Sequence, residues 1–220
     1  MKYKLAIFDL DGTLLDTLED LKDSVNFALA EYGLPTRSYA EIRRIVGHGI
    51  RNLVDNAVPE GTAQDVADLV FEAFKAHYKV HCADKTAPYP GIPELLRDVH
   101  AAGICVGVIS NKADGAVQEL MRTYFAGLVD VARGEVAGIP RKPAPDGVWA
   151  MIKEFGIDPA DAVYIGDSEV DIETANNAGL DHIIVTWGFR DRELLESRGA
   201  RVFADAPAEV FRLLCSRKHL

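Results

Sequence analysis

The stretch FDLDGTLLDT, residues 8–17, decides the fold of this chain and completes the apolar run Leu5–Phe8. A short run that is apolar at every position is typical of a strand buried on both faces of a parallel sheet. Asp9 and Asp11 place two carboxylates at the end of this strand, and Gly12 permits a sharp turn away from it. The sequence therefore predicts a buried strand that ends in a cluster of like charge.

Short apolar runs recur along the chain and predict further buried strands. They cover residues 104–109, 128–132, 162–165 and 183–186. Helical patterns lie before or between them, at residues 92–102, 113–124, 146–155 and 168–178. Strands and helices that alternate in this way indicate a parallel sheet with helices on both faces. The predicted fold class is α/β, with a doubly wound, Rossmann-like core.

Residues 17–82 interrupt this alternation with helical patterns only. These patterns cover residues 18–32, 39–46 and 66–78. Thr17 is a candidate N-cap for the first of them, and the return link at 87–91 holds two prolines and a glycine, as linkers often do. We therefore predict an all-helical cap domain at 17–82, inserted into a core domain that consists of 1–16 and 83–220.

The composition is that of an ordinary globular protein, with 48% hydrophobic residues. The 24 basic and 34 acidic residues give a net charge of −10. Because nucleic acids and anionic membranes bind basic surfaces, both are disfavoured as partners. An anionic substrate would have to be attracted by local positive charge or by a metal.

The cellular location is predicted from the cysteines and the apolar runs. Cys82, Cys105 and Cys215 form neither a paired motif nor a cluster with histidine. No apolar run reaches the roughly 18 residues that span a bilayer, and the first residues lack the pattern of a signal peptide. We expect a cytoplasmic protein with reduced thiols, either a monomer or a homodimer.

Polar residues follow three of the predicted strands at their carboxyl ends. Asp9 and Asp11 follow the first run, Ser110 and Asn111 follow the second, and Asp167 comes just after the fourth. Ligands of open parallel sheets bind beyond the carboxyl ends of the strands. We therefore expect these side chains to meet at one edge of the sheet.

The aspartates at this edge predict a magnesium site. Asp9, Asp11 and Asp167 would repel one another, and a hard divalent cation that prefers oxygen ligands would relieve the repulsion. Asp171 lies four residues after Asp167 on the same helix face, where it would orient a metal-bound water or a lysine. One such aspartate alone would indicate a helix cap or a turn, whereas four at one edge favour Mg²⁺.

Lys142 is the candidate for the fixed cation that a phosphate would need. It lies in RKPAPD, residues 141–146, where two prolines stiffen the chain. Taken alone, a lysine before a proline is more often a solvated surface charge. Ser110 and Asn111, together with backbone amides of the helix predicted to follow, would form an anion-binding corner, cap that helix, or do both.

Four motifs, DLDGTLLDT, ISNK, RKPAPD and GDSEVD, occur in the order and approximate spacing of the haloacid dehalogenase-like superfamily. The chain resembles that superfamily over essentially its whole length, helical cap included. It looks most like the phosphoglycolate phosphatases, on the segments VGHGIRNLV and AGLDHIIVTWGFRDRELLESRGA. The resemblance implies an Mg²⁺-dependent phosphatase for a small phosphomonoester, 2-phosphoglycolate or a similar metabolite, with a cap that closes over the site.

The resemblance also implies roles for individual residues. Asp9 would be the nucleophile that forms an aspartyl-phosphate, and Asp11 would protonate the leaving group and then activate water. Mg²⁺ would be held by Asp9, the backbone carbonyl of Asp11 and Asp167, with Asp171 in support. Ser110 and Lys142 would bind the transferring phosphoryl group. The expected substrate contacts are Asp9, Asp11, Gly12, Ser110, Asn111 and Lys142, with His48 and Arg51 from the cap.

The two cap residues have open alternatives. His48 lies between two glycines and either contacts the leaving group or only shapes its loop. Arg51 either binds a substrate carboxylate or is a solvated helix arginine. Other activities on the same scaffold are a sugar-phosphate mutase and a pyrophosphatase. A dehalogenase is disfavoured because such enzymes generally lack the second aspartate of the first motif, and a non-catalytic binding protein is disfavoured because the nucleophile and metal ligands are all present.

Overall fold

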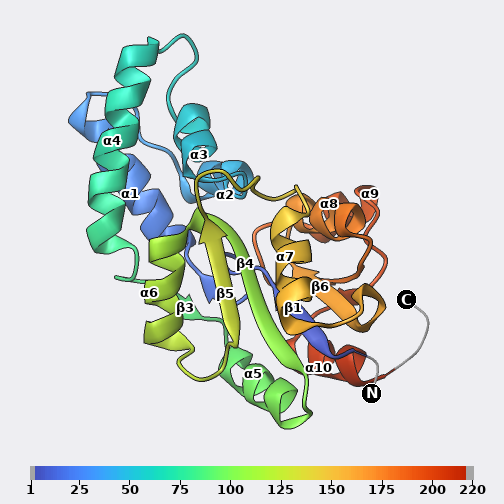
Figure 1. Ribbon diagram of the computed structural model, residues 1–220. Coiled ribbons are helices and arrows are strands. Elements are labelled where there is room, and N and C mark those ends of the chain that lie inside the picture. The colour runs from blue at the N-terminus through green and yellow to red at the C-terminus, as the bar shows by residue number, and fades with distance from the viewer. Residues whose placement is uncertain (1–2, 217–220) are drawn as a thin grey trace. The chain divides into compact units, whose positions relative to one another are not determined.

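The computed structural model describes residues 3–216 (Figure 1). Contacts between residues divide them into two compact units, residues 3–15 with 88–216 and residues 16–87. We call the first the α/β unit and the second the helical unit. The domain boundaries given above, at 17 and 82, stay a prediction. No helix within the described range is long and apolar enough to cross a membrane.

The α/β unit is built on a six-stranded sheet in which every strand pair is parallel. Its order is β5-β4-β1-β6-β7-β8. The strands are β1 (Leu5–Phe8), β4 (Cys105–Ala113), β5 (Val131–Glu135), β6 (Ala162–Gly166), β7 (Asp181–Val185) and β8 (Phe203–Ala204). All residues of β1 and β6 are buried, as expected for central strands covered on both faces. The predicted α/β fold class is confirmed.

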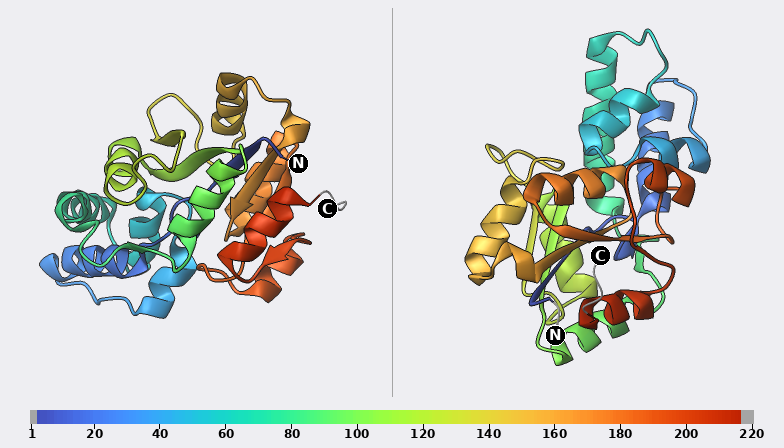
Figure 2. Two further views of the ribbon diagram at one scale, coloured as in Figure 1. Left: turned by 90° about the horizontal axis from the view of Figure 1, so that it is seen from below. Right: turned by 90° about the vertical axis from the view of Figure 1, so that its right-hand side faces the viewer.

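Helices cover both faces of this sheet (Figures 1 and 2). One face packs against α5 (Ile92–Ala101), α6 (Asp114–Tyr124) and α10 (Pro207–Cys215). The other packs against α7 (Asp146–Phe155), α8 (Glu169–Ala178) and α9 (Arg192–Ser197). A short 3₁₀ turn, Pro159–Asp161, precedes β6. Alternate residues of β1 enter opposite cores, since Ala6 and Phe8 pack on the first side and Leu5 and Ile7 on the second.

The helical unit contains α1 (Leu18–Glu31), α2 (Tyr39–Ile45), α3 (Ile50–Ala57) and α4 (Gln64–His81). The short strands β2 (Leu15–Asp16) and β3 (Ala87–Pro88) pair with each other. Thr17 occupies the N-cap position of α1, but its side chain makes no capping hydrogen bond, so the predicted cap is only positional. Asp20 instead ties α1 to the end of the unit, because its carboxylate accepts hydrogen bonds from Lys85 N and from Thr86 N and Oγ1.

Some predicted elements differ from the structure. The strand predicted at 128–132 begins three residues later, at Val131, because residues 126–130 form the turn that follows α6. The strand predicted at 104–109 continues to Ala113. Helix α3 follows Gly49, whose φ of 84° lies in the left-handed region. This short helix was not predicted, because the glycines on both sides of His48 indicated a loop. No prediction covered α9, β8 or α10.

Candidate active site

Three neighbouring strands deliver the site residues to one edge of the α/β unit. Strand β1 lies between β4 and β6, and Phe8 is in register with Val108 and Ile165. Because the strands are parallel, the residues beyond this level meet at the same carboxyl edge. These residues are Asp9 and Asp11 from β1, Ser110, Asn111 and Lys112 from β4, and Asp167 from β6.

Lys142 forms the central ion pair of the site. Its Nζ lies 2.8 Å from Asp9 Oδ1 and 2.8 Å from Asp171 Oδ1, and its side chain is only 4% exposed. Asp9 Oδ1 also accepts a hydrogen bond from Leu10 N at 2.6 Å. Among the described residues, Asp9 Oδ2 has no hydrogen-bond or ion-pair partner, which leaves this oxygen available for chemistry. The surface alternative for Lys142 is therefore wrong.

Asp171 orients its neighbours from the first turn of α8. Its Oδ2 accepts hydrogen bonds from Asp167 N, Ser168 N and Ser168 Oγ, at 3.2, 3.1 and 2.6 Å. Its Oδ1 holds Lys142, and the residue is fully buried. The strand before it leaves room for this carboxylate, since a Cβ on Gly166 would lie 2.3 Å from Asp171 Cγ. The hydrogen bonds favour the supporting role of Asp171 over direct metal ligation.

Asp167 is held by residues that the sequence predictions did not include. Thr13 Oγ1 donates to its Oδ1 at 3.0 Å, and Phe189 N donates to its Oδ2 at 2.7 Å. Gly12, with φ of 89°, lies so close that a Cβ there would be 2.5 Å from Asp167 Oδ2. Gly12 thus serves the turn, as predicted, and also makes space for this carboxylate. Thr13 stands in the opening motif, but only the fold brings it to Asp167.

A second buried lysine contacts the other aspartate of the first motif. Lys112 Nζ lies 2.9 Å from Asp11 Oδ1, and the two side chains are 3% and 19% exposed. Lys112 ends the ISNK motif, but it was not predicted as a site residue, because a lysine just before a predicted helix is usually solvated. The sequence did give one indication that Lys112 belongs to the site. Lys112 lies two residues after Ser110, and residues two apart on a strand point to the same face.

Ser110 and Asn111 lie within β4 and do not cap the following helix. Helix α6 has Ala113 at its N-cap position, so the predicted capping role is wrong. Ser110 Oγ accepts a hydrogen bond from Lys112 N at 3.2 Å, and Asn111 Nδ2 donates to the Lys142 carbonyl oxygen at 3.1 Å. The buried residues here are Ser110, Asn111, Lys112 and Lys142. Asn111 thus fastens the segment that carries Lys142 to the edge of the sheet.

The electrostatics of the site show an excess of negative charge. Burial, with repulsion from Asp171, raises the pKa of Asp9 well above its usual range despite the nearby Lys142 ammonium. Burial and Asp171 also raise the pKa of Asp167 to about 7, although the Phe189 N–H and the Thr13 hydroxyl oppose the shift. Burial would lower the pKa of Lys142, but Asp171 and Asp9 raise it well above its usual value.

The residues present fit a hard divalent cation. Oxygen atoms of Asp9, Asp167 and Asp171 lie within 4.8 Å of one another, and all three residues are buried. Lys142 is the one cation that contacts this group among the ion pairs described, so one ammonium faces three carboxylates. A donor set of oxygens alone, with charge left to neutralise, is the chemistry that Mg²⁺ prefers. The cluster is therefore compatible with a magnesium site.

His48 and Arg51 belong to the helical unit, and their predicted substrate contacts stay predictions. His48 lies between Gly47 and Gly49, which both have φ in the left-handed region. The Arg51 guanidinium pairs with Asp55 and Asp68, at 2.9 and 2.7 Å. Its guanidinium carbon also lies 5.1 Å from the centre of the Phe71 ring. Arg51 is thus part of a surface network on α3 and α4.

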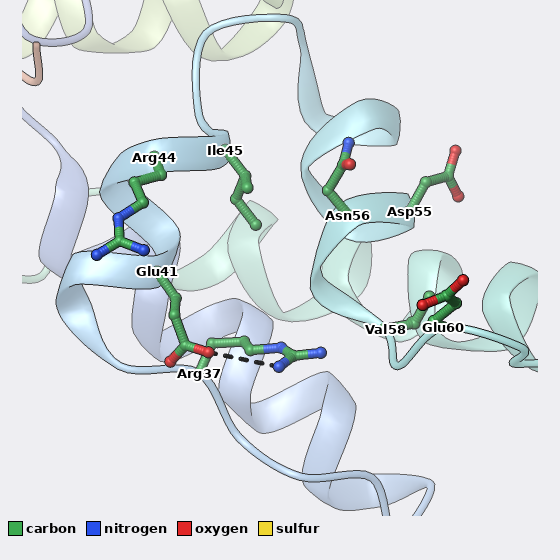
Figure 3. A pocket seen from close by; sticks show the side chains of 8 residues that line it. All are labelled: Arg37, Glu41, Arg44, Ile45, Asp55, Asn56, Val58 and Glu60. Atoms are coloured by element: carbon green, nitrogen blue, oxygen red, sulfur yellow. Dashed lines mark hydrogen bonds and ion pairs between the residues drawn. The ribbon is translucent and has the colours of Figure 1, made fainter.

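Each unit also has a cavity outside the carboxylate cluster. A groove of about 480 Å³ in the helical unit is lined by side chains of both charges, with Arg37 paired to Glu41 at 3.4 Å (Figure 3). A cavity of about 360 Å³ in the α/β unit touches Ser110, Asn111 and Lys142. Its described lining does not include the aspartates of the cluster. This second cavity therefore flanks the site and does not contain it.

Comparison with known proteins agrees with the four motifs. The family described as haloacid dehalogenase-like hydrolase matches residues 6–185. A phosphoglycolate phosphatase of Mesorhizobium japonicum is 34% identical over 212 residues, which cover 93% of this chain and 92% of that protein. An N-acetylmuramic acid 6-phosphate phosphatase of Pseudomonas aeruginosa is 32% identical, with 97% and 96% covered.

A solved structure shares the fold over nearly the whole length. The crystal structure of a candidate phosphoglycolate phosphatase from Lactobacillus delbrueckii subsp. bulgaricus superimposes with a TM-score of 0.93 at 38% sequence identity, and it covers 97% of this chain and 99% of that one. The resemblance inferred from the motifs is confirmed, and the chain belongs to the haloacid dehalogenase-like hydrolase family.

Proposed function

We propose that this chain is an Mg²⁺-dependent phosphatase that hydrolyses a small phosphomonoester through an aspartyl-phosphate on Asp9. The observation that carries the proposal is the pairing of two buried lysines with the two aspartates of the first motif, Lys142 with Asp9 and Lys112 with Asp11. Phosphoryl transfer requires mainly positioning and charge stabilisation. The buried Lys142 ammonium beside the nucleophile Asp9 supplies both, and the Lys112 ammonium holds Asp11 in position.

In the first half of the reaction, Asp9 Oδ2 attacks the phosphorus atom. This oxygen has no partner among the described residues, whereas Oδ1 is fixed by Lys142 and Leu10 N. The bond from phosphorus to the leaving oxygen breaks, and Asp11 gives that oxygen a proton. Lys142 and the Ser110 hydroxyl bind the phosphoryl oxygens as charge develops on them.

In the second half, water cleaves the aspartyl-phosphate. Asp11, now ionised, takes a proton from the attacking water. The new phosphorus–oxygen bond forms as the bond to Asp9 breaks, which releases inorganic phosphate and restores the carboxylate. Splitting one difficult hydrolysis into two easier steps is the general advantage of a covalent nucleophile.

The proposed metal ligands are Asp9, Asp167 and the backbone carbonyl of Asp11, supported by Asp171. A bound Mg²⁺ would supply a further fixed positive charge for the phosphoryl oxygens. The same charge would oppose the burial and the repulsion that raise the pKa values of Asp9 and Asp167. The protein's part is to keep these carboxylates buried and oriented.

Two relatives suggest the substrate class. One is a phosphoglycolate phosphatase and the other an N-acetylmuramic acid 6-phosphate phosphatase, and both of those substrates combine a phosphomonoester with a carboxylate. We propose 2-phosphoglycolate or a similar small carboxylated phosphomonoester for this chain. In this proposal His48 would contact the leaving group and Arg51 would bind the substrate carboxylate.

The test is phosphate release from a panel of phosphorylated compounds, with and without Mg²⁺. The panel includes 2-phosphoglycolate, N-acetylmuramic acid 6-phosphate, simple alkyl phosphates and pyrophosphate. The expected result is Mg²⁺-dependent release, highest for a carboxylated phosphomonoester. Absence of release from every monoester would contradict the proposal, and release from pyrophosphate alone would favour a pyrophosphatase.

The mutase alternative needs a separate measurement. In a mutase the phosphoryl group passes from Asp9 to another sugar hydroxyl and not to water. Incubation with a sugar 1-phosphate, followed by NMR, would show the 6-phosphate if this occurred. A phosphatase gives free sugar and inorganic phosphate.

A further inference from the structure

The Asp167 carboxylate lies in a slot between two glycines. A Cβ on Gly12 would be 2.5 Å from Asp167 Oδ2, and a Cβ on Gly188 would be 2.4 Å from the same oxygen. Real Cβ atoms essentially never lie within 3.0 Å of such neighbours. Any side chain at Gly188 would therefore displace the carboxylate. The slot is formed by the opening motif on one side and by residues 187–190 on the other.

Residues 187–190 reach Asp167 from the segment that follows β7. Phe189 N donates to Asp167 Oδ2 at 2.7 Å, and Trp187 Nε1 donates to the Thr13 carbonyl oxygen at 3.1 Å. Thr13 in turn donates its hydroxyl to Asp167 Oδ1. The segment has no helix or strand of its own, so it needs other contacts to stay in place.

Arg190 provides such a contact. Its Nε lies 2.8 Å from Glu169 Oε2, and its Nη2 lies 3.2 Å from Glu169 Oε1. The side chains of Arg190 and Glu169 are 6% and 15% exposed, and Glu169 is the first residue of α8, two positions after Asp167. A planar bidentate pair of this kind fixes both distance and orientation. The pair thus joins the segment to the start of the helix that follows Asp167.

We propose that Arg190, through its bidentate pair with Glu169, is a positioning residue that holds Gly188 and Phe189 against Asp167 and thereby sets the affinity of the carboxylate cluster for its divalent cation. The inference rests on the magnesium site of the proposed function. Partners that orient a metal-binding carboxylate typically affect metal affinity by about 10–100-fold. Arg190 itself does not touch the reacting atoms.

The experiment measures Mg²⁺ binding by titration calorimetry, in the absence of substrate. Arg190→Gln is expected to weaken binding by about 10-fold or more. Glu169→Gln should have a similar effect, and the double variant should be little worse than either single one because both remove the same contact. Arg190→Lys keeps the charge but not the bidentate geometry, so its affinity should lie between wild type and Arg190→Gln.

A matched control comes from the neighbouring exposed pair. Arg192 Nε lies 2.9 Å from Glu196 Oε1, and both side chains are about half exposed. Arg192→Gln removes the same charge two residues away, and it should leave Mg²⁺ affinity unchanged. Melting temperatures measured without Mg²⁺ separate a change in affinity from loss of folding.

Three outcomes overturn the inference. A folded Arg190→Gln protein that binds Mg²⁺ as tightly as wild type contradicts it, and the proposed phosphatase activity is then unaffected. If Arg190→Gln does not fold, Gly188→Ala is the second test, because its added Cβ would displace the Asp167 carboxylate. Wild-type Mg²⁺ affinity in Gly188→Ala also contradicts the inference. A wild-type protein that shows no Mg²⁺ binding overturns both this inference and the metal dependence of the proposed function.

Discussion

The ion pairs at the carboxyl edge of the sheet are buried, whereas those on the surface of the helical unit are exposed. In the α/β unit, Lys142 is 4% exposed and its partner Asp9 is 11% exposed. In the helical unit, Arg51 is 35% exposed and its partner Asp68 is 55% exposed. Burying charges costs desolvation energy that pairing often fails to recover, so buried pairs are poor devices for stability. The buried pairs at the edge of the sheet are therefore best explained by chemistry, and the exposed pairs by solubility and small local effects.

Loss of Lys142 should have the largest effect. Lys142→Met leaves Asp9 and Asp171 without their shared ammonium, so phosphate release should fall by about 100-fold or more. The free energy of unfolding should also fall, by about 3 kcal/mol or more without Mg²⁺, as measured by urea denaturation. Lys153 on α7 is exposed, and Lys153→Met is the matched control, which should change neither quantity much. A fully active Lys142→Met protein would contradict the distinction between the buried pairs at the sheet edge and the exposed pairs.

The pH dependence of stability should reveal the crowded carboxylates. Asp167 has a pKa of about 7 in the folded protein against 3.8 for an ordinary aspartate, so the folded state binds more protons than the unfolded state between these values. Its contribution therefore lowers stability as pH rises from about 4 to about 7. The shift of roughly 3 pH units corresponds to at most about 4 kcal/mol.

The measurement compares wild type with Asp167→Asn without Mg²⁺. The free energy of unfolding is measured by urea denaturation at each pH. That of wild type should fall relative to that of the variant as pH rises from 5 through about 7. Saturating Mg²⁺ should remove this trend, because the cation compensates the charge. If the difference in free energy of unfolding between the two proteins does not change with pH, the pKa of Asp167 is not raised in the folded protein.

Loss of Lys112 should have a smaller effect than loss of Lys142. Lys112→Met removes the partner of Asp11, whose side chain is 19% exposed and can be partly solvated. We expect kcat for an alkyl phosphate to fall by roughly 10-fold, because Asp11 loses the contact that positions it for proton transfer to the leaving oxygen. An aryl phosphate, whose leaving group needs little protonation, should be affected less. Equal losses for both substrates would indicate that Lys112 acts on the phosphoryl group and not through Asp11.

Loss of Arg51 should have the smallest effect on stability. Arg51→Ala removes contacts with Asp55 and Asp68 that are largely solvated. The free energy of unfolding should change by less than about 1 kcal/mol. The KM for 2-phosphoglycolate, measured on the same variant, tests the predicted substrate contact separately. A stability loss as large as that of Lys142→Met would contradict the distinction between exposed and buried pairs.

The sheet and the principal aspartates were predictable because a buried strand is recognised from a short, local run of apolar residues. The short runs that form β1 and β6 are apolar and buried, and the residue just after such a strand must lie at the ligand-binding edge of a parallel sheet. Asp9 and Asp167 could be placed in this way. Their packing beside Lys142 followed from the resemblance and from the need for a fixed cation.

The remaining site residues depend on contacts between distant segments. Lys112 reaches Asp11 across 101 positions of sequence, and the place of Lys112 on the same strand as Ser110 does not by itself name Asp11 as its partner. Gly188 and Phe189 contact Asp167 only because β7 lies beside β6. Ser110 and Asn111 resembled helix caps, but the strand continued through them and the helix began later. In each case the position of the residue depends on tertiary contacts that the local sequence does not specify.

The most direct test of the central claim is a search for phosphate on Asp9. The protein is mixed with 2-phosphoglycolate and Mg²⁺, quenched on the time scale of one turnover, digested and analysed by mass spectrometry. The account predicts one phosphoryl group on the peptide that contains Asp9, formed and lost at rates consistent with turnover, and none in Asp9→Asn. Turnover by wild type with no such intermediate, or undiminished phosphate release by Asp9→Asn, would contradict it.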